Sequence, residues 1–499
     1  MSWWRGAVLY HVYVRSFADS NGDGIGDLPG LLGRLDHLVR LGVDGIWLSP
    51  TMPSPNADWG YDVSDYCAVH PELGTLADLD RLIAEAGRRG IRVLLDLVPN
   101  HTSNRHAWFA ESRASRDSAK REWYVWTDRP NNWLASFGGP AWTLDERTGQ
   151  YYLHNFLPEQ PDLNWWSEEV RDAFDGILRF WFERGIVGFR IDVAHGIVKD
   201  RRLRDNPPAL PNDPPQVRAH GQRSVYSANR PEVHEVLGRW RRLAEEYEPA
   251  RLLLGETYVF EAAQLADFYG ELRLALNVPF LFAPLEADAL ARVVEETGRL
   301  LGPDACPLWC GSSHDAVRFP TRWCEGDPAR VRCALVALLT LPGTALLYYG
   351  DEIGMPQVDV PRGRARDSAG GRDGSRTPMQ WSPEAGAGFT EPGVEPWLPL
   401  GDARASNVAE QDGDADSTLT LCRDLIALRR GLTGPYERLP APPGVWRYRR
   451  GPDAEVVLNL SARPARVETQ GTIRLATGRG REGEQASVLA LEPWEAVVL

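Results

Sequence analysis

The 499-residue chain has few cysteines and no long apolar run. Its six cysteines form no repeated Cys-x-x-Cys pair, which argues against a disulfide scaffold and favours a reduced, cytoplasmic setting with buried free thiols. No stretch of about 18 apolar residues occurs, so no membrane span is predicted. The N-terminal stretch MSWWRGAVLYHVYVRSF is interrupted by His11 and Arg15 and precedes no small-residue cleavage site, so no secretory signal is predicted.

Positive charge is also scarce. Lys and Arg total 55 against 69 Asp and Glu, which gives a formal net charge of -14. Nucleic-acid binding needs clustered positive charge, so we expect no nucleic-acid partner. Tryptophan, in contrast, is abundant, with 19 residues, many of them beside polar residues as in NADWGY, QPDLNWW and RTPMQW. Aromatic faces next to carboxylates and amides suit sugars.

Short apolar runs alternate with amphipathic helical patterns from residue 7 onward. Eight runs are typical of strands, at 7–14, 42–50, 92–101, 186–195, 251–258, 276–282, 308–315 and 344–352. Repeated strand–helix–strand units give a parallel sheet with right-handed crossovers. Eight such units favour an α/β fold closed as a (β/α)8 TIM barrel over the alternative, an open doubly wound sheet.

Three segments break this alternation. Residues 101–169 are rich in Asn, Trp, Pro and Gly and too long for a loop, so they predict a subdomain inserted after the third strand. Residues 361–400 are typical of a long irregular connection over the barrel mouth. Residues 433–499 hold short strand-like runs without a helical period and predict an antiparallel β-domain. The barrel itself would comprise residues 1–100 and 170–432.

Several predicted strands end in an acid or a histidine. Asp96, Asp192, Glu256 and the pair His314–Asp315 each follow an apolar run. The C-terminal strand ends of a barrel form the face that builds active sites, whereas packing alone would place apolar residues there. Since clustered carboxylates repel one another in a medium of low dielectric constant, we expect this ring to be functional.

Paired carboxyl groups suit cleavage of a glycosidic bond, with one acting as nucleophile and the other as general acid and base. The two groups of a retaining enzyme would lie about 5 Å apart. Metal-dependent hydrolysis through His101 and His314 is the alternative, but no two histidines share the spacing of a helix-borne ligand pair. Arg190 would repel a cation. We expect it instead to lower the pKa of Asp192, whereas Glu256 as an acid needs the opposite.

The motifs DLVPNH, GFRIDVAH, LLLGE and HDAVR resemble the four sequence regions of glycoside hydrolase family 13, the α-amylase family. The resemblance extends through nearly the whole chain. It implies a (β/α)8 barrel, a domain B after strand three, a C-terminal β-sandwich and α-retaining chemistry. It also implies that Asp192 is the nucleophile, Glu256 the general acid and base, and Asp315 the transition-state stabiliser. The sugar at the cleavage site would be bound by His101, Phe156, Arg190 and His314.

Three further motifs are similar to the oligo-1,6-glucosidase and α-glucosidase branch: QPDLN at 160–164, DWGYD at 58–62 and GRDGSRTPMQW at 371–381. In similar enzymes the residue matching Asp58 binds the terminal glucose and the residue matching Tyr61 stacks beneath it. Arg376 would pair with Asp58 and close the pocket, which implies exo-action on a short α-glucoside or oligosaccharide. A transglucosylase or a sucrose or maltose isomerase is the alternative on this scaffold, and a non-catalytic sugar-binding subunit is a remote one.

The stretch DSNGDGIGDLPG at 19–30 has carboxylate or amide side chains at alternating positions. It fits the first nine positions of an EF-hand, but position 12 is Gly30 and a strand-like run precedes it, so a calcium sensor is not predicted. A Gly/Asp/Asn turn cluster without metal is the alternative. The family resemblance implies one structural, non-catalytic Ca²⁺, held by Asp19, Asn21, Asp23, Asp27 and the Ile25 carbonyl.

Two residues depart from the family pattern. Ser313 stands where an Asn usually precedes the His-Asp pair, which leaves the hydrogen bonds that position Asp315 to another group. Val193 follows the expected nucleophile, and in related enzymes a Val there accompanies α-1,6 activity, but the Ala194-His195 that follows leaves the linkage preference open. We expect a monomer or small homo-oligomer.

Overall fold

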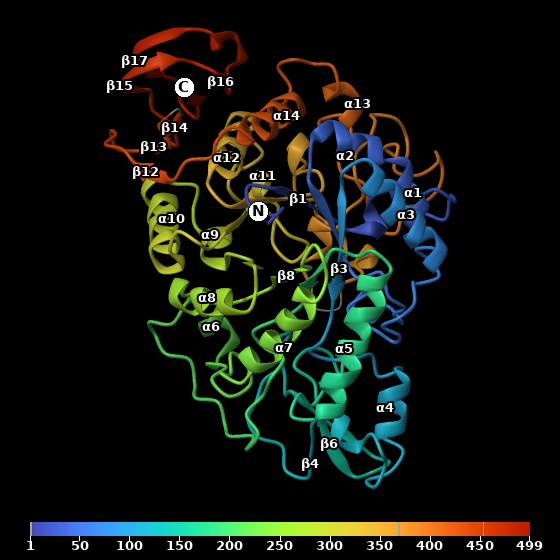
Figure 1. Cartoon of the computed structure of the whole chain (residues 1–499). Coiled ribbons are helices and arrows are strands. Elements are labelled where there is room, and N and C mark those ends of the chain that lie inside the picture. The colour runs from blue at the N-terminus through green and yellow to red at the C-terminus, as the bar shows by residue number, and fades with distance from the viewer. Residues whose placement is uncertain (1, 368–369, 453) are drawn as a thin grey trace.

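The computed structural model describes residues 2–367, 370–452 and 454–499. Its centre is an eight-stranded sheet in the order β10-β11-β1-β2-β3-β7-β8-β9 (Figure 1). The strands are β1 (Val8–Val12), β2 (Gly45–Leu48), β3 (Arg92–Leu97), β7 (Gly188–Ile191), β8 (Leu252–Gly255), β9 (Leu274–Ala275), β10 (Leu308–Cys310) and β11 (Thr344–Tyr348). Neighbouring strands pair in parallel, and a parallel bridge between Leu276 and Leu308 joins the two ends of the sheet. The predicted (β/α)8 barrel is confirmed.

Helices surround the strands (Figure 1). The main ones are α2 (Leu35–Leu41), α3 (Leu76–Arg88), α5 (Glu168–Glu183), α7 (Val233–Glu245), α10 (Ala287–Leu301), α12 (Pro328–Thr340) and α14 (Thr418–Arg429). Local sequence fixes their ends. Thr75 and Asp78 form a reciprocal capping box at the start of α3, and α2 ends at Gly42, which takes the left-handed conformation that Gly adopts without strain. The helical segments that the periodicity predicts are thus present.

One strand prediction was wrong. Residues 276–282 do not form a strand: β9 is only Leu274–Ala275, and the chain then enters helix α9 (Val278–Phe282). The Asn277 side chain accepts a hydrogen bond from the backbone N–H of Phe280, and Pro279 lies in the first turn. An Asn cap followed by Pro starts a helix, and this local signal outweighs the aromatic content that suggested a strand.

Between β3 and α5 the chain leaves the barrel. This part contains helix α4 (Ala107–Ser112) and an antiparallel sheet of β4 (Trp126–Thr127), β6 (Gln150–Leu153) and β5 (Trp142–Asp145). Trp133, Trp142 and Leu153 form a small core of its own. In Figure 1, β4 and β6 lie at the bottom of the view.

The C-terminal part forms antiparallel sheets, as the fold class predicts. Five strands pair in the order β12-β13-β14-β18-β16, and β15 pairs with β17. They are β12 (Tyr436–Arg438), β13 (Val445–Arg450), β14 (Glu455–Asn459), β15 (Ala465–Thr472), β16 (Leu475–Ala476), β17 (Gln485–Leu491) and β18 (Ala496–Val498). Val457, Leu489 and Val497 form a separate core between them. In Figure 1 these strands lie at the end of the molecule opposite β4 and β6.

The segment that follows β11 is mostly irregular and returns to the N-terminal loops. The Trp397 backbone N–H donates to Gly24 at 2.9 Å, and its indole N–H donates to Ser16 Oγ at 3.0 Å. The Trp397 ring lies parallel to Tyr13 at 5.9 Å and 5.0 Å from Trp59. Segments more than 330 residues apart in the sequence therefore pack together beside the barrel mouth.

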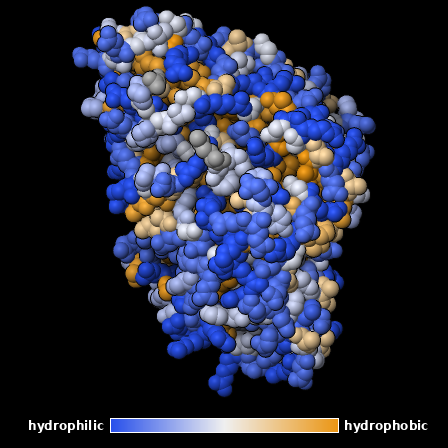
Figure 2. All heavy atoms as spheres, viewed as in Figure 1, coloured by the Kyte–Doolittle hydropathy of each residue, from blue (hydrophilic) through white to orange (hydrophobic). Residues whose placement is uncertain are grey.

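The face shown in Figure 2 is mainly hydrophilic, with hydrophobic residues in small patches. Over the described residues, no helix combines the length and apolar character that crossing a bilayer requires. All six cysteines are unpaired, and five of them are buried.

Candidate active site

A cavity of about 780 Å³ opens at the C-terminal ends of the barrel strands. Its walls include Asp192 after β7, Glu256 after β8 and Asp315 after β10, together with Asp58 and Arg372 from long connections. The side chains that the sequence predicts to converge therefore do so in one pocket.

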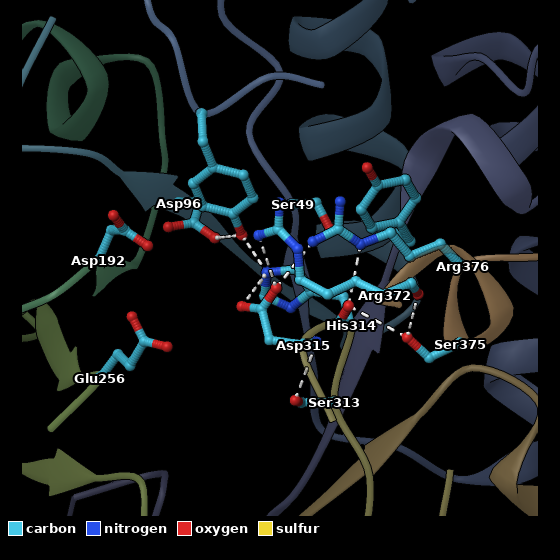
Figure 3. A network of polar contacts seen from close by, with 12 residues as sticks. Ser49, Asp96, Asp192, Glu256, Ser313, His314, Asp315, Arg372, Ser375 and Arg376 are labelled. Carbon is cyan, nitrogen blue, oxygen red and sulfur yellow. Dashed lines mark hydrogen bonds and ion pairs between the residues drawn. The ribbon is translucent and has the colours of Figure 1, made fainter. Parts of the chain in front are cut away.

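Arg190 forms ion pairs with three acids of the site. Its side chain is fully buried in β7, and its Nη1 lies 2.8 Å from Asp96 Oδ1 and 2.6 Å from Asp192 Oδ1. Its Nη2 lies 2.8 Å from Glu256 Oε2. Asp192 and Glu256 consequently sit on the two terminal nitrogens of one guanidinium, and Figure 3 shows their carboxyl groups next to each other. Both carboxyl groups of the predicted catalytic pair therefore contact the same cation.

Arg190 lowers the pKa of Asp192, as predicted, but other effects outweigh it. Burial raises the pKa of Asp192, and although Arg190 opposes this, the charges of Glu256 and Asp96 raise it further, so it lies well above the usual value. Burial also raises the pKa of Asp96, to about 7, against the pull of Arg190. Arg190, which is shared with Glu256, does not offset the burial of Asp192 and Asp96.

Asp315 has the opposite environment. Its Oδ1 lies 2.7 Å from Arg376 Nη2 and 3.3 Å from Arg372 Nη1, and its Oδ2 lies 3.0 Å from His314 Nε2. Burial alone would raise the pKa of Asp315, but the contact with His314 and the guanidinium groups of Arg376 and Arg372 hold it well below its usual range. Figure 3 shows this cluster facing the Asp192–Glu256 pair. Asp315 is therefore held as a carboxylate.

Ser313 supports Asp315 through the backbone. Its Oγ accepts a hydrogen bond from the Asp315 N–H at 3.2 Å. The next residue, Ala316, forms an isolated antiparallel bridge with Ser313. A serine turn thus fixes the chain at the position where the family pattern has Asn.

The ionic clamp on Asp58 uses a different arginine from the predicted one. Arg372 Nη2, not Arg376, lies 2.7 Å from Asp58 Oδ1. Arg376 is buried, and its Nε donates to the His314 carbonyl at 2.9 Å, so it is directed at Asp315. The short 3₁₀ turn Asp373–Ser375 separates the two arginines and turns them to different acids. Arg372 is in turn held by Asp367 Oδ1 at 2.6 Å. Arg372 could have been considered from the sequence, because it lies in the same GRDGSRTPMQW motif as Arg376.

Gln160 is a second site residue that the sequence reasoning did not single out. Its Nε2 donates to Asp58 Oδ2 at 3.2 Å and lies 3.0 Å from His101 Nε2. This explains the position of the QPDLN motif. The ring of Phe156 lies 5.2 Å from that of His101 and contributes to the cavity wall.

Tyr61 connects the two groups of acids. Its hydroxyl donates to Asp96 Oδ2 at 3.1 Å and lies 2.5 Å from His314 Nε2. Its ring is stacked on that of His314, with centroids 5.3 Å apart and planes at 5°. Tyr61 lines the cavity and His314 packs against it, whereas contact of either residue with a sugar stays a prediction.

A buried ion pair supports His101 from behind. Lys199 Nζ lies 2.8 Å from Asp162 Oδ2, and both side chains are buried. Asn100 Nδ2 donates to Asp162 Oδ1 at 3.1 Å and lies 3.0 Å from His101 Nδ1. The inserted segment and the barrel are thus joined directly behind the pocket.

The loop at 19–27 folds on its own polar groups. Asp19 accepts from the backbone N–H of Gly22 and Gly24, and Asp27 caps the next helix through the N–H of Gly30 at 2.6 Å. Across the parts of the chain that the structure describes, no three His, Cys, Asp or Glu side chains cluster as a metal site. Asp19 and Asp27 both accept hydrogen bonds within the loop, and the Ca²⁺ site stays a prediction.

The barrel, its strand-end acids and the pocket at the barrel mouth define a barrel enzyme of the glycoside hydrolase class. The chain belongs to the α-amylase family: the family described as alpha amylase, catalytic domain, matches residues 11–433. The predicted family is confirmed, and the protein is a glycoside hydrolase.

Relatives and solved structures agree with this assignment. The chain is 42% identical to a probable alpha-glucosidase of Rhizobium meliloti (strain 1021), with 86% of this chain and 82% of that protein covered. It is 36% identical to an oligo-1,6-glucosidase of Halalkalibacterium halodurans, over 99% and 98%. It superimposes on an alpha-glucosyl transfer enzyme with a TM-score of 0.92 at 38% identity, covering 100% and 99%. An isomaltulose synthase from Protaminobacter rubrum gives 0.90 at 29%, with the same coverage.

Proposed function

We propose that the protein is a retaining, exo-acting α-glucosidase that releases glucose from short α-glucosides. The observation that carries the proposal is the placement of Asp192 and Glu256 on the two terminal nitrogens of Arg190 in one closed pocket. The relatives named alpha-glucosidase and oligo-1,6-glucosidase support the hydrolytic reading.

The reaction would proceed in two displacements. Asp192 Oδ forms a bond to the anomeric carbon as the glycosidic C–O bond breaks, and Glu256 gives its proton to the leaving oxygen. Glu256 then takes a proton from water, whose oxygen attacks the anomeric carbon and frees Asp192. Developing positive charge on the sugar ring favours the ionised form of Asp192, which burial otherwise disfavours. Asp315, held as a carboxylate by its arginines, stabilises the same charge.

Exo-action would follow from the clamp that closes the pocket. Asp58 is bound by Arg372 at 2.7 Å and by Gln160 at 3.2 Å, so a wall of paired polar groups stands beyond the catalytic acids. These groups would donate and accept hydrogen bonds to the hydroxyls of one terminal glucosyl unit and would block a second.

The proposal is tested by replacing the nucleophile. We expect Asp192→Asn to lower kcat on p-nitrophenyl α-glucoside by more than about 10³-fold, because the amide cannot form the covalent intermediate. Its circular dichroism spectrum should match that of the native protein. Asp128→Asn, at an exposed position, is the matched control and should keep full activity. Substantial residual turnover in Asp192→Asn would contradict the assigned role.

Transfer to an acceptor sugar is the second candidate, favoured by the likeness to the alpha-glucosyl transfer enzyme and the isomaltulose synthase. The same intermediate serves both reactions, which differ in whether water or another hydroxyl attacks it. Chromatography of products from maltose, isomaltose, sucrose and trehalose at high concentration separates them: glucose supports hydrolysis and new disaccharides support transfer. The same panel reads out the linkage preference, and any turnover excludes the non-catalytic alternative.

A further inference from the structure

The cavity continues outward from the catalytic acids. Its volume of about 780 Å³ lies in the range of sites for drug-sized molecules. The Asp58–Arg372 clamp closes one end. The leaving group of any substrate must therefore occupy the remaining space, between the segment after β8 and the connection that contains helix α6 (Pro215–His220).

This outer part has an apolar wall. Three separate segments contribute to it: the residue after Asp192, the connection around α6 and the chain after Glu256. The apolar residues that line it are Val193, Val217, Val225, Tyr258, Val259 and Phe260. Tyr258 and Phe260 meet edge to face, with centroids 5.2 Å apart and planes at 85°. The wall is therefore formed by tertiary packing of three segments, and not by one face of a single helix.

Two of these side chains are exposed to an unusual extent for apolar residues. Val225 is 41% exposed and Tyr258 is 40% exposed, and both face the cavity. Water in contact with such surface is displaced favourably by an apolar group, and exposed apolar surface inside a concave site marks a place where a ligand binds.

Two arginines of this wall lie near carboxylates. Arg223 lies 3.7 Å from Asp213. Arg230 lies 3.5 Å from Glu232 and 3.9 Å from Asp200. Each of these two arginines therefore faces a carboxylate, which disfavours a phosphorylated or carboxylated leaving group and favours a neutral one.

We propose that this part of the cavity binds a neutral hydrophobic aglycone, so that alkyl and aryl α-glucosides are preferred over glucosides of small polar alcohols. The inference rests on the proposed glucosidase function, since the same pocket must hold the glucosyl unit. It adds the chemical class of the leaving group.

A homologous series tests the proposal without changing the chemistry of the leaving oxygen. We expect kcat/KM to rise from methyl to propyl, butyl and hexyl α-glucoside by up to about fourfold for each methylene that enters the wall. α-Glucosyl fluoride, which has no aglycone, reports on the glucosyl half of the site alone.

Variants locate the effect. Val225→Ser and Val217→Ser should each reduce the slope of the series by about half or more and leave turnover of the fluoride within about twofold of native. Neither Val is buried, so both variants are expected to fold, which thermal unfolding checks. Val488→Ser, an exposed Val in β17, is the matched control and should change neither the slope nor the turnover of the fluoride.

A flat series in the native protein, or an unchanged slope in both Val variants, would overturn the proposal. Absence of turnover even with the fluoride would instead overturn the proposed function, and this inference with it.

Discussion

Arg372 illustrates how single side chains define the pocket. It bridges Asp58 and Asp315 and is itself held by Asp367. Removing one partner of a buried, hydrogen-bonded charge pair typically costs about 2–5 kcal/mol. We therefore expect Arg372→Met to lower kcat/KM on p-nitrophenyl α-glucoside by about 30-fold or more. Arg372→Lys should restore only part of this, because ammonium cannot replace the guanidinium fork.

Arg362→Met is the matched control for this experiment. Arg362 lies on the same segment but is exposed, so its loss should leave kcat/KM unchanged. Equal losses in the two Met variants would indicate that the segment, and not the clamp, is disturbed.

A second residue-scale prediction concerns Asp351, which is fully buried after β11. Its carboxyl accepts from Ser312 Oγ at 2.8 Å and from the Tyr348 N–H at 2.9 Å, and burial raises its pKa to about 7. The folded protein therefore binds this proton more tightly than the unfolded chain. The resulting stabilisation is complete below about pH 4 and is lost as the pH rises through about 7.

We expect Asp351→Asn to lack this loss. As the pH rises from 4.5 to 8, the difference between the free energy of unfolding of the variant and that of the native protein should therefore shift by about 2–4 kcal/mol in favour of the variant. Urea unfolding at several pH values measures this, with Asp128→Asn as a control that should follow the native curve. Parallel curves for the native protein and Asp351→Asn would show that Asp351 does not titrate in this range.

At this scale the sequence predicted which acids meet but not how they are charged. Asp192, Glu256 and Asp315 follow apolar runs, and strand ends of a barrel must converge, so their proximity follows from topology alone. The pairing of Arg372 with Asp58 and the raised pKa of Asp192 depend on side-chain directions and on burial by distant segments. No spacing in the sequence encodes those quantities.

Among the elements, the loop at 19–27 carries the calcium prediction. Asp23 is exposed and accepts only from the Ile25 N–H in the described contacts. If Ca²⁺ binds the folded loop, adding it after chelation should raise the melting temperature by about 2–5 °C. Asp23→Ala should abolish this response, whereas Asp117→Ala, at an exposed position of the inserted segment, should retain it.

An unchanged melting temperature in the native protein would favour the alternative, a turn cluster held by hydrogen bonds. Catalysis should be indifferent to Ca²⁺ in either case, because the loop contributes none of the residues that line the cavity.

Element prediction succeeded where periodicity and caps agreed. Helix α3 has its apolar stripe and its Thr75–Asp78 box in register, so both its type and its start follow from the sequence. The segment 276–282 failed because its composition suggested a strand while Asn277 and Pro279 encoded a helix start. Local cap chemistry was the stronger signal there.

At the scale of the whole molecule, Arg450 joins the C-terminal domain to the barrel. It extends from β13 and donates to the carbonyls of Thr340 at the end of α12, of Leu432 at 2.6 Å and of Gly434 at 3.0 Å. The buried position lowers its pKa to about 10. It remains charged at neutral pH and satisfies the C-terminal end of α12.

Arg450→Met should therefore leave several buried carbonyls without partners and lower the free energy of unfolding by about 2–4 kcal/mol. Arg449→Met is the matched control. Arg449, the preceding residue in the chain, is partly exposed and makes one ion-pair contact of 3.4 Å, with Glu437. That variant should change stability by less than about 0.5 kcal/mol. Similar losses in both would refute the docking role of Arg450.

The contact of Trp397 with Ser16, Gly24 and Tyr13 has a consequence for biosynthesis. Asp192, Glu256 and Asp315 all leave the ribosome before residue 397 does, yet the loops that border the sugar pocket are covered only once that indole arrives. A nascent chain stopped near residue 360 would carry every reacting carboxyl but neither Arg372 nor Arg376. The groups that bind Asp58 and Asp315 therefore join the site late in translation.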